Sequence, residues 1–191
     1  MDQDELALYV IERLGEVGIA YMVVGSYASN MYGEPRATND IDIVVAARFP
    51  QIEQLAARLD DDKYLSLQAA RDALLNQSLF SVIDTKSGWK VDLIPRKRRP
   101  FDHASFHRRL AGRLLDREIC VLSPEDAILS KLEWAKKSDS ERQLRDVESM
   151  LVLQWEKIDF EYLRTWAPEL SVTGLLEQVV EDVRQLKGRG F

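Results

Sequence analysis

The sequence predicts a mixed α/β fold, with a small mixed β-sheet flanked by helices over residues 1–120 and a helical bundle over residues 121–191. Two observations predict this division. Short apolar runs bounded by glycine and other turn residues dominate the first part, as is typical of strands. From Ser123 onward the apolar residues recur at helical spacing instead. A chain of 191 residues is long enough for one well-cored domain with a small helical appendage.

The expected elements follow in order along the chain. In the first part they are a helix ending at Gly18, a buried strand over 20–24, a brief helix over 26–32 capped by Ser26, a strand over 40–46, a helix over 51–59, and a hairpin whose strands span 79–85 and 89–94. In the second part they are helices that begin at Ser123-Pro124, at Ser140, at Phe160 and at Thr173.

The composition limits the class and the location of the protein. Hydrophobic residues make up 46% and charged residues 30%, which excludes a mainly disordered chain. The net charge of −6 argues against a protein that coats nucleic acid with its whole surface, but it allows a local basic groove. A single cysteine, an acidic start and the lack of an apolar run of about 20 residues predict a cytoplasmic protein with no membrane partner.

Two aspartates stand two positions apart in the strand expected over 40–46. Asp40 and Asp42 therefore point to one face of the strand, whereas Ile41 and Ile43 point to the opposite face, towards a core. Two carboxylates held this close repel each other unless a cation lies between them. Magnesium suits such a pair, because it takes carboxylate oxygens together with phosphate oxygens. The alternative is a solvated strand end with two unrelated aspartates.

The turn before this strand favours the functional interpretation. Gly25 and Ser26 end one strand and open a helix, which presents backbone N–H groups to an anion. Glycine at this point would let a phosphate approach the backbone closely. A phosphate-binding turn next to a metal-binding strand is the layout that phosphoryl-group chemistry requires.

A third acid lies on the second strand of the expected hairpin. Lys90 and Asp92 face one way there, and Val91 and Leu93 face the other. Asp92 could complete a two-metal carboxylate cluster, or it could act as the base that deprotonates an attacking hydroxyl. The alternative is an edge-strand aspartate in water.

These residues together resemble the signature of the DNA polymerase beta-like nucleotidyltransferase superfamily. That signature is a Gly-Gly or Gly-Ser turn followed after roughly a dozen residues by an Asp-x-Asp strand, as in Gly25-Ser26 and Asp40-Ile41-Asp42. A third carboxylate on a later strand is usual in the superfamily, and Asp92 is similar to it. Arg36 and Thr38 form an Arg-x-Thr before the acids, which some members share. The resemblance covers roughly residues 20–95.

The C-terminal part resembles a narrower group. Residues 123–131, with the later Arg145-Asp146-Val147, are similar to the AbiEii-like type IV toxin nucleotidyltransferases and to related uncharacterised bacterial proteins. In that group a helical lysine and a later helical aspartate accompany the catalytic acids. By position these residues are Lys131 and Asp146.

The helical spacing gives Lys131 independent support. It lies three residues after Ile128 and four before Ala135, so it projects near the apolar face of its helix. A lysine aimed inwards is costly unless it meets an anion such as a carboxylate or a nucleotide phosphate. The alternatives are a lysine that extends along the edge of that face to water, and an ion pair between Lys131 and Asp146 on two helices.

The resemblance implies a reaction and its components. A nucleoside monophosphate would move from a nucleoside triphosphate to a hydroxyl of an RNA end such as tRNA, of a protein or of a small molecule, with pyrophosphate as the leaving group. Mg²⁺ or Mn²⁺ would be the cofactor, held by Asp40, Asp42 and Asp92, with Lys131 and Asp146 as further catalytic residues. The nucleotide phosphates would be bound by Gly25, Ser26, Arg36, Thr38 and Lys131. The chain could then belong to a toxin–antitoxin pair with a cognate antitoxin as partner.

A basic segment follows the strand that carries Asp92. Residues 96–99 are Arg, Lys, Arg and Arg between two prolines, and His103 and His107 lie a short distance beyond. The segment could clamp a triphosphate or an RNA acceptor, or it could be a solvated loop. For the whole chain, the alternative function is a non-catalytic module of the same fold that binds a nucleotide or a partner.

Overall fold

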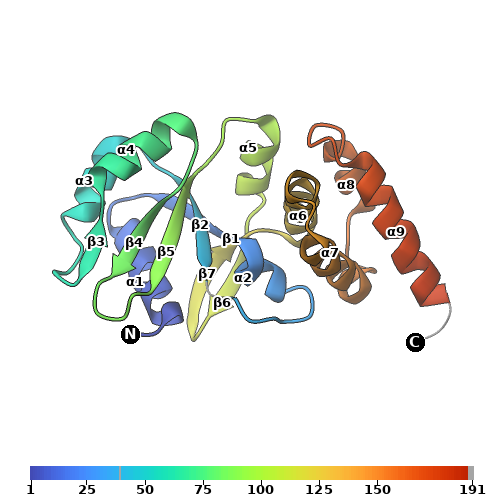
Figure 1. Cartoon of the computed structure of the whole chain (residues 1–191), viewed down its shortest axis with the longest axis horizontal. Helices are drawn as coiled ribbons and strands as arrows, with labels where there is room; N and C mark the ends of the chain where they lie inside the picture. Colours follow the sequence, from blue (N-terminus) through green and yellow to red (C-terminus); the bar gives the residue numbers. More distant parts are fainter. Residues whose placement is uncertain (39, 189–191) are drawn as a thin grey trace. The chain divides into compact units, whose positions relative to one another are not determined.

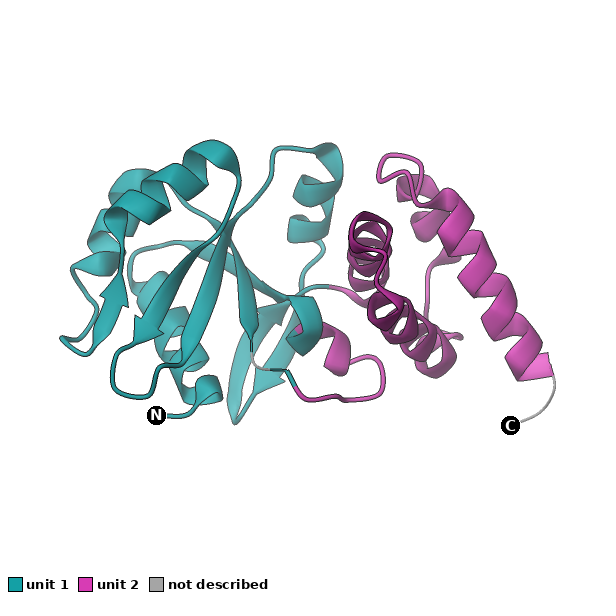
Figure 2. Cartoon of the chain, viewed as in Figure 1, with its two compact units in different colours: residues 1–27, 38–122 teal, residues 28–37, 123–191 magenta. Residues whose placement is uncertain are grey.

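A computed structural model describes residues 1–38 and 40–188 of the chain. Contacts within the chain divide it into two compact units (Figure 2). Unit 1 comprises Met1–Tyr27 and Thr38–Leu122, and unit 2 comprises Ala28–Ala37 and Ser123–Phe191. The short segment 28–37 therefore belongs with the helical C-terminal residues, although its neighbours in the sequence on both sides belong to unit 1.

Unit 1 is a mixed sheet with helices (Figure 1). Its strands are β1 (Ala20–Val24), β2 (Ile41–Ala46), β3 (Lys63–Leu65), β4 (Phe80–Asp84), β5 (Lys90–Pro95), β6 (Leu110–Leu114) and β7 (Arg117–Val121). Its helices are α1 (Gln3–Glu16), α3 (Phe49–Ala56), α4 (Leu67–Asn76) and α5 (Pro100–His107), and α2 (Gly25–Asn30) begins in this unit. The mixed α/β class predicted from the sequence is confirmed.

The sheet has the strand order β3-β4-β5-β2-β1-β7-β6. The pairs β2–β5 and β1–β7 are parallel, and the other neighbouring pairs are antiparallel. The strands that carry the predicted acids, β2 and β5, are therefore direct neighbours in the interior of the sheet. The alternative of Asp92 on an edge strand is excluded, because β5 lies between β4 and β2.

The alternation of buried and partly exposed residues along β2 places Asp42 on the face opposite the core, as predicted. Ile41, Ile43 and Val45 are fully buried, whereas Asp42 between them is only partly enclosed. Because successive strand residues point to opposite faces, the core fixes the direction of Asp42. Asp40 was expected inside this strand, but it lies one residue before the strand begins.

Several elements of unit 1 differ from the expectation. The hairpin of β4 and β5 is confirmed, while helix α3 begins two residues earlier than predicted, with Pro50 in its first turn. Strand β3, helices α4 and α5, and the hairpin of β6 and β7 were not predicted. The β6 and β7 strands contain many exposed residues, so they lack the strong apolar pattern that marks a buried strand.

Unit 2 consists of helices that begin where the sequence predicts. They are α6 (Pro124–Ser138), α7 (Glu141–Gln154), α8 (Phe160–Trp166) and α9 (Thr173–Gly188). The side chain of Ser123 accepts a hydrogen bond from the Asp126 N–H and so caps α6, and Asp159 caps α8 in the same way. No helix within residues 1–38 and 40–188 is long and apolar enough to span a bilayer.

The segment 28–37 is tied to α7 by hydrogen bonds. Gln154 donates from Nε2 to the Tyr32 carbonyl over 3.0 Å, and the Glu34 N–H donates to the Ser149 hydroxyl. A Cβ on Gly33 would lie 2.9 Å from Oγ of Ser149, so only glycine allows this close approach. These contacts explain why the segment belongs to unit 2.

Candidate active site

Asp42 and Asp92 stand side by side on neighbouring parallel strands. The register of β2 and β5 pairs Asp42 with Asp92, and the register of β1 and β2 pairs Val24 with Asp42. Paired residues on adjacent strands project to the same face of a sheet. Two carboxylates therefore come together in the middle of the sheet, at the point where β1 ends and the Gly25 turn begins.

The Gly25 turn lies directly against Asp42. Gly25 has φ +66°, a left-handed conformation that favours glycine. A Cβ at this position would overlap Oδ2 of Asp42 and lie 3.1 Å from its Cγ. Glycine was expected here so that a phosphate could approach the backbone. Within unit 1, the neighbour that requires glycine is the Asp42 carboxylate.

Asp92 is nearly enclosed, with 5% of its surface exposed. Both of its oxygens accept hydrogen bonds. Oδ1 accepts from the Ser81 hydroxyl, and Oδ2 accepts from the Lys90 ammonium, each over 2.5 Å. A buried carboxylate is tolerated when it is paired in this way. Ser81 lies opposite Asp92 in the register of β4 and β5, which explains its position.

Lys90 links two of the predicted acids. Its Nζ lies 2.5 Å from Oδ2 of Asp92 and 3.5 Å from Oδ1 of Asp40. The hydrogen bond to Asp92 raises the pKa of Lys90 above its ordinary value, although burial opposes this effect. The lysine is therefore fully charged at neutral pH. Asp40, with 57% of its side chain exposed, is the most open of the three acids.

The donor set fits a hard divalent cation. Carboxylate oxygens are the preferred ligands of Mg²⁺ and Mn²⁺, and Asp40 and Asp92 already share one cation in the form of the Lys90 ammonium. Within the described part of the chain, no group of three or more His, Cys, Asp or Glu side chains has the spacing of a formed metal site. Closing the acids around a metal would therefore require side-chain movement.

Three other predicted phosphate-binding residues lie around the turn and the loop that follows it. Ser26 occupies the first turn of α2 and is partly buried. Thr38 donates from its hydroxyl to the Asp40 carbonyl over 3.2 Å, so it shapes the backbone that enters β2. Arg36 is fixed through its backbone, because Asn30 donates to its carbonyl and accepts from its N–H. Their roles towards a nucleotide stay predictions.

Arg36, Lys131 and Asp146 meet within unit 2. Arg36 donates from Nε and from one terminal nitrogen to the two oxygens of Asp146, each over 2.9 Å. Lys131 donates from Nζ to Oδ2 of Asp146 over 2.6 Å and to Gln143 over 3.1 Å. The ion pair between Lys131 and Asp146, one of the alternatives from the sequence, is present. Lys131 does not extend to water, since 6% of its side chain is exposed.

The electrostatics of this cluster keep Asp146 ionised. Burial by itself would raise the pKa of Asp146, but the hydrogen bonds from Arg36 and Lys131 outweigh that effect and hold the pKa below its ordinary value. Two cations share one carboxylate, so the cluster carries a surplus of one positive charge. Arg36 is the more accessible of its two cations, with 25% of its side chain exposed.

Four residues that contact the predicted site residues were not themselves predicted as site residues, namely Asn30, Ser81, Lys90 and Gln143. The signal for Lys90 was visible, since it precedes Asp92 by two residues and therefore shares its face. Asn30, Ser81 and Gln143 are revealed by side-chain contacts with Arg36, Asp92 and Lys131, which lie 6, 11 and 12 positions away in the sequence.

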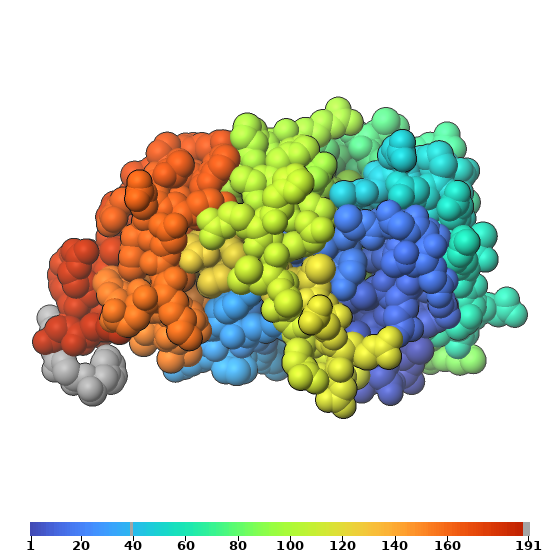
Figure 3. Space-filling model, turned by 180° about the vertical axis from the view of Figure 1, so that it is seen from behind, coloured from blue at the N-terminus to red at the C-terminus, as the bar shows by residue number. Residues whose placement is uncertain are grey.

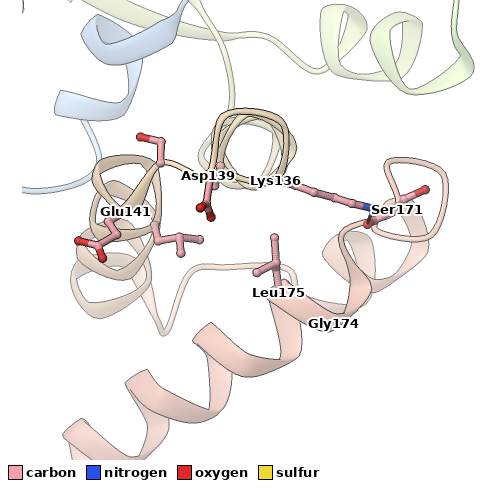
Figure 4. A pocket seen from close by; sticks show the side chains of 9 residues that line it. Lys136, Asp139, Glu141, Ser171, Gly174 and Leu175 are labelled. Atoms are coloured by element: carbon pink, nitrogen blue, oxygen red, sulfur yellow. Dashed lines mark hydrogen bonds between the residues drawn. The ribbon is translucent and has the colours of Figure 1, made fainter.

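A pocket of about 430 Å³ lies within unit 2 (Figure 4). It is bordered by Leu144 and Leu175 together with Lys136, Asp139 and Glu141. The Lys136 ammonium reaches across to the Ser171 carbonyl over 2.8 Å. None of the predicted site residues lines this pocket, so it is separate from both charged clusters.

Comparison with solved structures identifies similar folds. The crystal structure of ANT(2")-Ia in complex with adenylyl-2"-tobramycin superposes with a TM-score of 0.60 and 12% identity, over 88% of this chain and 97% of that chain. A nucleotidyltransferase-like protein from Paracoccidioides brasiliensis superposes with a TM-score of 0.57 and 14% identity, over 94% of this chain and 92% of that chain. The lincomycin-bound lincosamide antibiotic adenylyltransferase LnuA superposes with a TM-score of 0.51 and 13% identity, over 78% of this chain and 96% of that chain.

The sequence alone gives no such link, because no protein-family model and no curated protein sequence matches the chain. The similarity therefore rests on the three-dimensional arrangement. This chain has the fold of solved nucleotidyltransferases and carries an acid cluster on the central strands of that fold.

Proposed function

We propose that this protein is a metal-dependent nucleotidyltransferase that transfers a nucleoside monophosphate from a nucleoside triphosphate to an acceptor hydroxyl. The observation that carries the proposal is the pairing of Asp42 with Asp92 on parallel strands beside the Gly25 turn. The structural fold supports the same reaction class. A non-catalytic nucleotide-binding module is the alternative, and it is disfavoured because all three acids are present.

The chemistry follows from the charges in this cluster. Asp40, Asp42 and Asp92 would hold Mg²⁺ or Mn²⁺, which would neutralise phosphate charge and stabilise the transition state. The acceptor oxygen attacks the α-phosphorus, a new P–O bond forms, and the bond to the β-phosphate breaks to release pyrophosphate. The proton of the hydroxyl passes to a carboxylate, for which Asp92 is the candidate.

Two roles of Asp92 can be separated by measurement. If Asp92 is a metal ligand, Asp92→Asn weakens binding of Mn²⁺ by the free protein and lowers transfer in parallel. If it is the general base, the variant keeps Mn²⁺ binding and loses transfer only. Asp42→Asn, which removes a proposed metal ligand beside the Gly25 turn, is the reference for the first pattern.

Positive charge for the triphosphate would come from Arg36 and Lys131. The surplus charge of their cluster with Asp146 supports this part of the proposal. Arg36 is the better phosphate ligand of the two, because 25% of its side chain is exposed, compared with 6% for Lys131. We expect Arg36→Gln to raise the KM for the nucleotide more than it lowers kcat, as expected for a group that binds substrate and transition state alike.

The acceptor is suggested by the charge of one surface segment. Residues 96–113 contain seven Lys or Arg residues and one Asp, a net charge of +6, so the remainder of the chain carries −12. The guanidinium groups of Arg96 and Arg109 lie 5.2 Å and 4.6 Å from the centre of the Phe106 ring. Much of this segment reaches the surface on the face shown in Figure 3. Concentrated positive charge of this kind favours a polyanionic acceptor such as tRNA.

A small-molecule acceptor is the second candidate. It is favoured by the fold, since ANT(2")-Ia was solved with adenylyl-2"-tobramycin and LnuA is named as a lincosamide antibiotic adenylyltransferase. A protein acceptor, a role in a toxin–antitoxin pair and a cognate antitoxin follow from the AbiEii-like resemblance alone and stay predictions.

The test is transfer of radiolabel from each α-labelled nucleoside triphosphate in the presence of Mg²⁺. The acceptors are total RNA, a cell lysate and a panel of aminoglycoside and lincosamide antibiotics. We expect label on one acceptor class, and loss of at least about 1,000-fold of the rate in Asp42→Asn, because metal-ion and electrostatic stabilisation supply several kcal/mol of the barrier.

The matched control is Asp61→Asn, which removes one carboxylate from an exposed position outside the cluster and is expected to transfer at the wild-type rate. Failure to label any acceptor from any triphosphate would contradict the enzymatic proposal. Equal labelling by wild type and Asp42→Asn would contradict the site. Nucleotide binding without transfer would favour the non-catalytic module.

A further inference from the structure

Lys90 has a position that the acid cluster by itself does not explain. It lies on β5 two residues before Asp92, and its ammonium contacts both Asp92 and Asp40. A single cation therefore already bridges two of the three carboxylates. The Lys90 side chain is 43% exposed, so part of it borders solvent.

The second oxygen of Asp92 is also engaged. Oδ1 accepts from the Ser81 hydroxyl, while Oδ2 accepts from Lys90. A carboxylate oxygen can accept more than one hydrogen bond, so Asp92 can in principle take a metal as well. However, a divalent cation at Oδ2 would lie next to the lysine ammonium, and like charges at this distance repel each other strongly.

We propose that Lys90 is a built-in counter-cation of the carboxylate cluster, whose ammonium must withdraw before a divalent cation can bridge Asp40 and Asp92. The lysine thus keeps the acids together when no metal is bound, and it weakens the binding of a divalent cation at that position. This inference rests on the proposed function only in that the acids are taken to bind a divalent cation.

The charge balance supports this arrangement. Asp40 and Asp92 with one ammonium carry a net charge of −1, whereas the same two carboxylates without Lys90 would carry −2. A lysine is suited to a reversible role, because its ammonium is a point charge on a flexible four-carbon chain. Arginine would hold the carboxylates more rigidly through its planar fork.

The experiment measures binding of Mn²⁺ to the full chain without nucleotide, by calorimetry and by electron paramagnetic resonance of the free ion. We expect Lys90→Gln to bind Mn²⁺ about tenfold more tightly than the wild type. Lys90→Arg keeps the charge and is expected to bind no more tightly than the wild type. Lys86→Gln is the matched control, since Lys86 lies in the turn between β4 and β5, is 78% exposed and pairs with Asp62 instead. Its affinity should stay within about twofold of the wild type.

A double variant places the effect at the cluster. Adding Asp92→Asn to Lys90→Gln should remove the gain in affinity, because the oxygen that Lys90 releases is then no longer charged. An equal or weaker affinity in Lys90→Gln would overturn the proposal. A gain of the same size in Lys86→Gln, or a gain that survives Asp92→Asn, would overturn it as well.

Thermal unfolding provides a second readout that does not depend on the affinity measurement. In the presence of a chelator, Lys90→Gln should melt below the wild type, because Asp40 and Asp92 then lose the ammonium that they share. Mn²⁺ should raise its melting temperature by more than it raises that of the wild type. If Lys90→Gln does not fold in the chelator, recovery of the folded state on addition of Mn²⁺ supports the proposal, and no recovery overturns it.

These outcomes are distinct from those of the transfer assay. Wild-type transfer together with unchanged Mn²⁺ affinity in Lys90→Gln would leave the proposed function standing and remove the role of Lys90. Tighter Mn²⁺ binding by Lys90→Gln, together with no transfer to any acceptor by the wild type, would support the role of Lys90 and contradict the proposed function.

Discussion

The two charged clusters of this protein are built in opposite ways. In unit 1, Asp40 and Asp92 share the ammonium of Lys90, so that negative charge is in excess in this group and Asp40 is largely open to solvent. In unit 2, Arg36 and Lys131 share Asp146, so that positive charge is in excess and the lysine is almost fully enclosed.

This difference affects how much each cluster contributes to stability. A group of like charges held together is costly for the fold, and such groups persist where a ligand compensates them. A buried carboxylate between two cations depends on its partners, because the removal of one leaves an unpaired charge inside the protein. Neutralising Asp146 in unit 2 should therefore cost more stability than neutralising the exposed Asp40 in unit 1.

The largest expected effect is on the stability of unit 2. Asp146→Asn should lower the free energy of unfolding by about 2–4 kcal/mol, because Arg36 and Lys131 would remain close together without their shared anion. Asp40→Asn, in contrast, removes a largely exposed carboxylate that lies 3.5 Å from Lys90, and it should change the free energy of unfolding by less than about 1 kcal/mol in a chelator. Urea unfolding at neutral pH measures both. Equal destabilisation by the two substitutions would contradict the distinction between the clusters.

The pH dependence sharpens this prediction. Because the pKa of Asp146 in the folded state lies below its unfolded value, the unfolded state binds more protons in acid. The stability that Asp146 contributes is therefore complete above about pH 4, the ordinary range of an aspartate, and it is lost as the pH falls through the folded-state pKa. We expect the difference in unfolding free energy between wild type and Asp146→Asn to be constant from neutral pH to about pH 5 and to shrink below about pH 4. A difference that grows in acid would be inconsistent with this sign.

The contact of Gly25 with Asp42 can be tested by two glycine substitutions. Gly18 and Gly25 have nearly the same φ, +65° and +66°, but a Cβ at Gly18 has no neighbour within 4 Å, whereas at Gly25 it overlaps the Asp42 carboxylate. Both alanine variants should lose about 1 kcal/mol for the left-handed backbone. Gly25→Ala should lose a further ~1 kcal/mol of stability, because its Cβ displaces Asp42. For the same reason its rate of nucleotide transfer should fall by about tenfold or more. If the two variants behave alike, the contact with Asp42 has no role.

The smallest expected effect concerns Ser81. Ser81→Ala removes the hydrogen bond to Oδ1 of Asp92 and should cost about 1–2 kcal/mol of stability. Ser78→Ala, at an exposed position before β4, is the control and should change stability by less than about 0.5 kcal/mol. If Ser81 also orients Asp92, its loss lowers the transfer rate several-fold without changing the KM for the nucleotide. A rise in KM alone would instead indicate a role in nucleotide binding.

Much of the local structure could be predicted from the sequence. The alternation around Asp42, the hairpin between β4 and β5, and the start of α6 at Ser123 all depend on neighbouring residues. Strand β3 and the hairpin of β6 and β7 could not be predicted in this way, because they are short or exposed and have no clear apolar period.

The features of the candidate site also fall into those that the sequence predicts and those that only the folded structure shows. The sequence by itself determined that Asp42 points away from the core and that Lys90 shares a face with Asp92, because both follow from the two-residue period of a strand. Only the tertiary structure decided that β2 lies next to β5 with Asp42 opposite Asp92, and that Arg36 meets Asp146 across 110 positions of the sequence. Strand order, register and the contacts between distant segments depend on hydrogen bonds and packing that form when the chain folds, so no local pattern contains them.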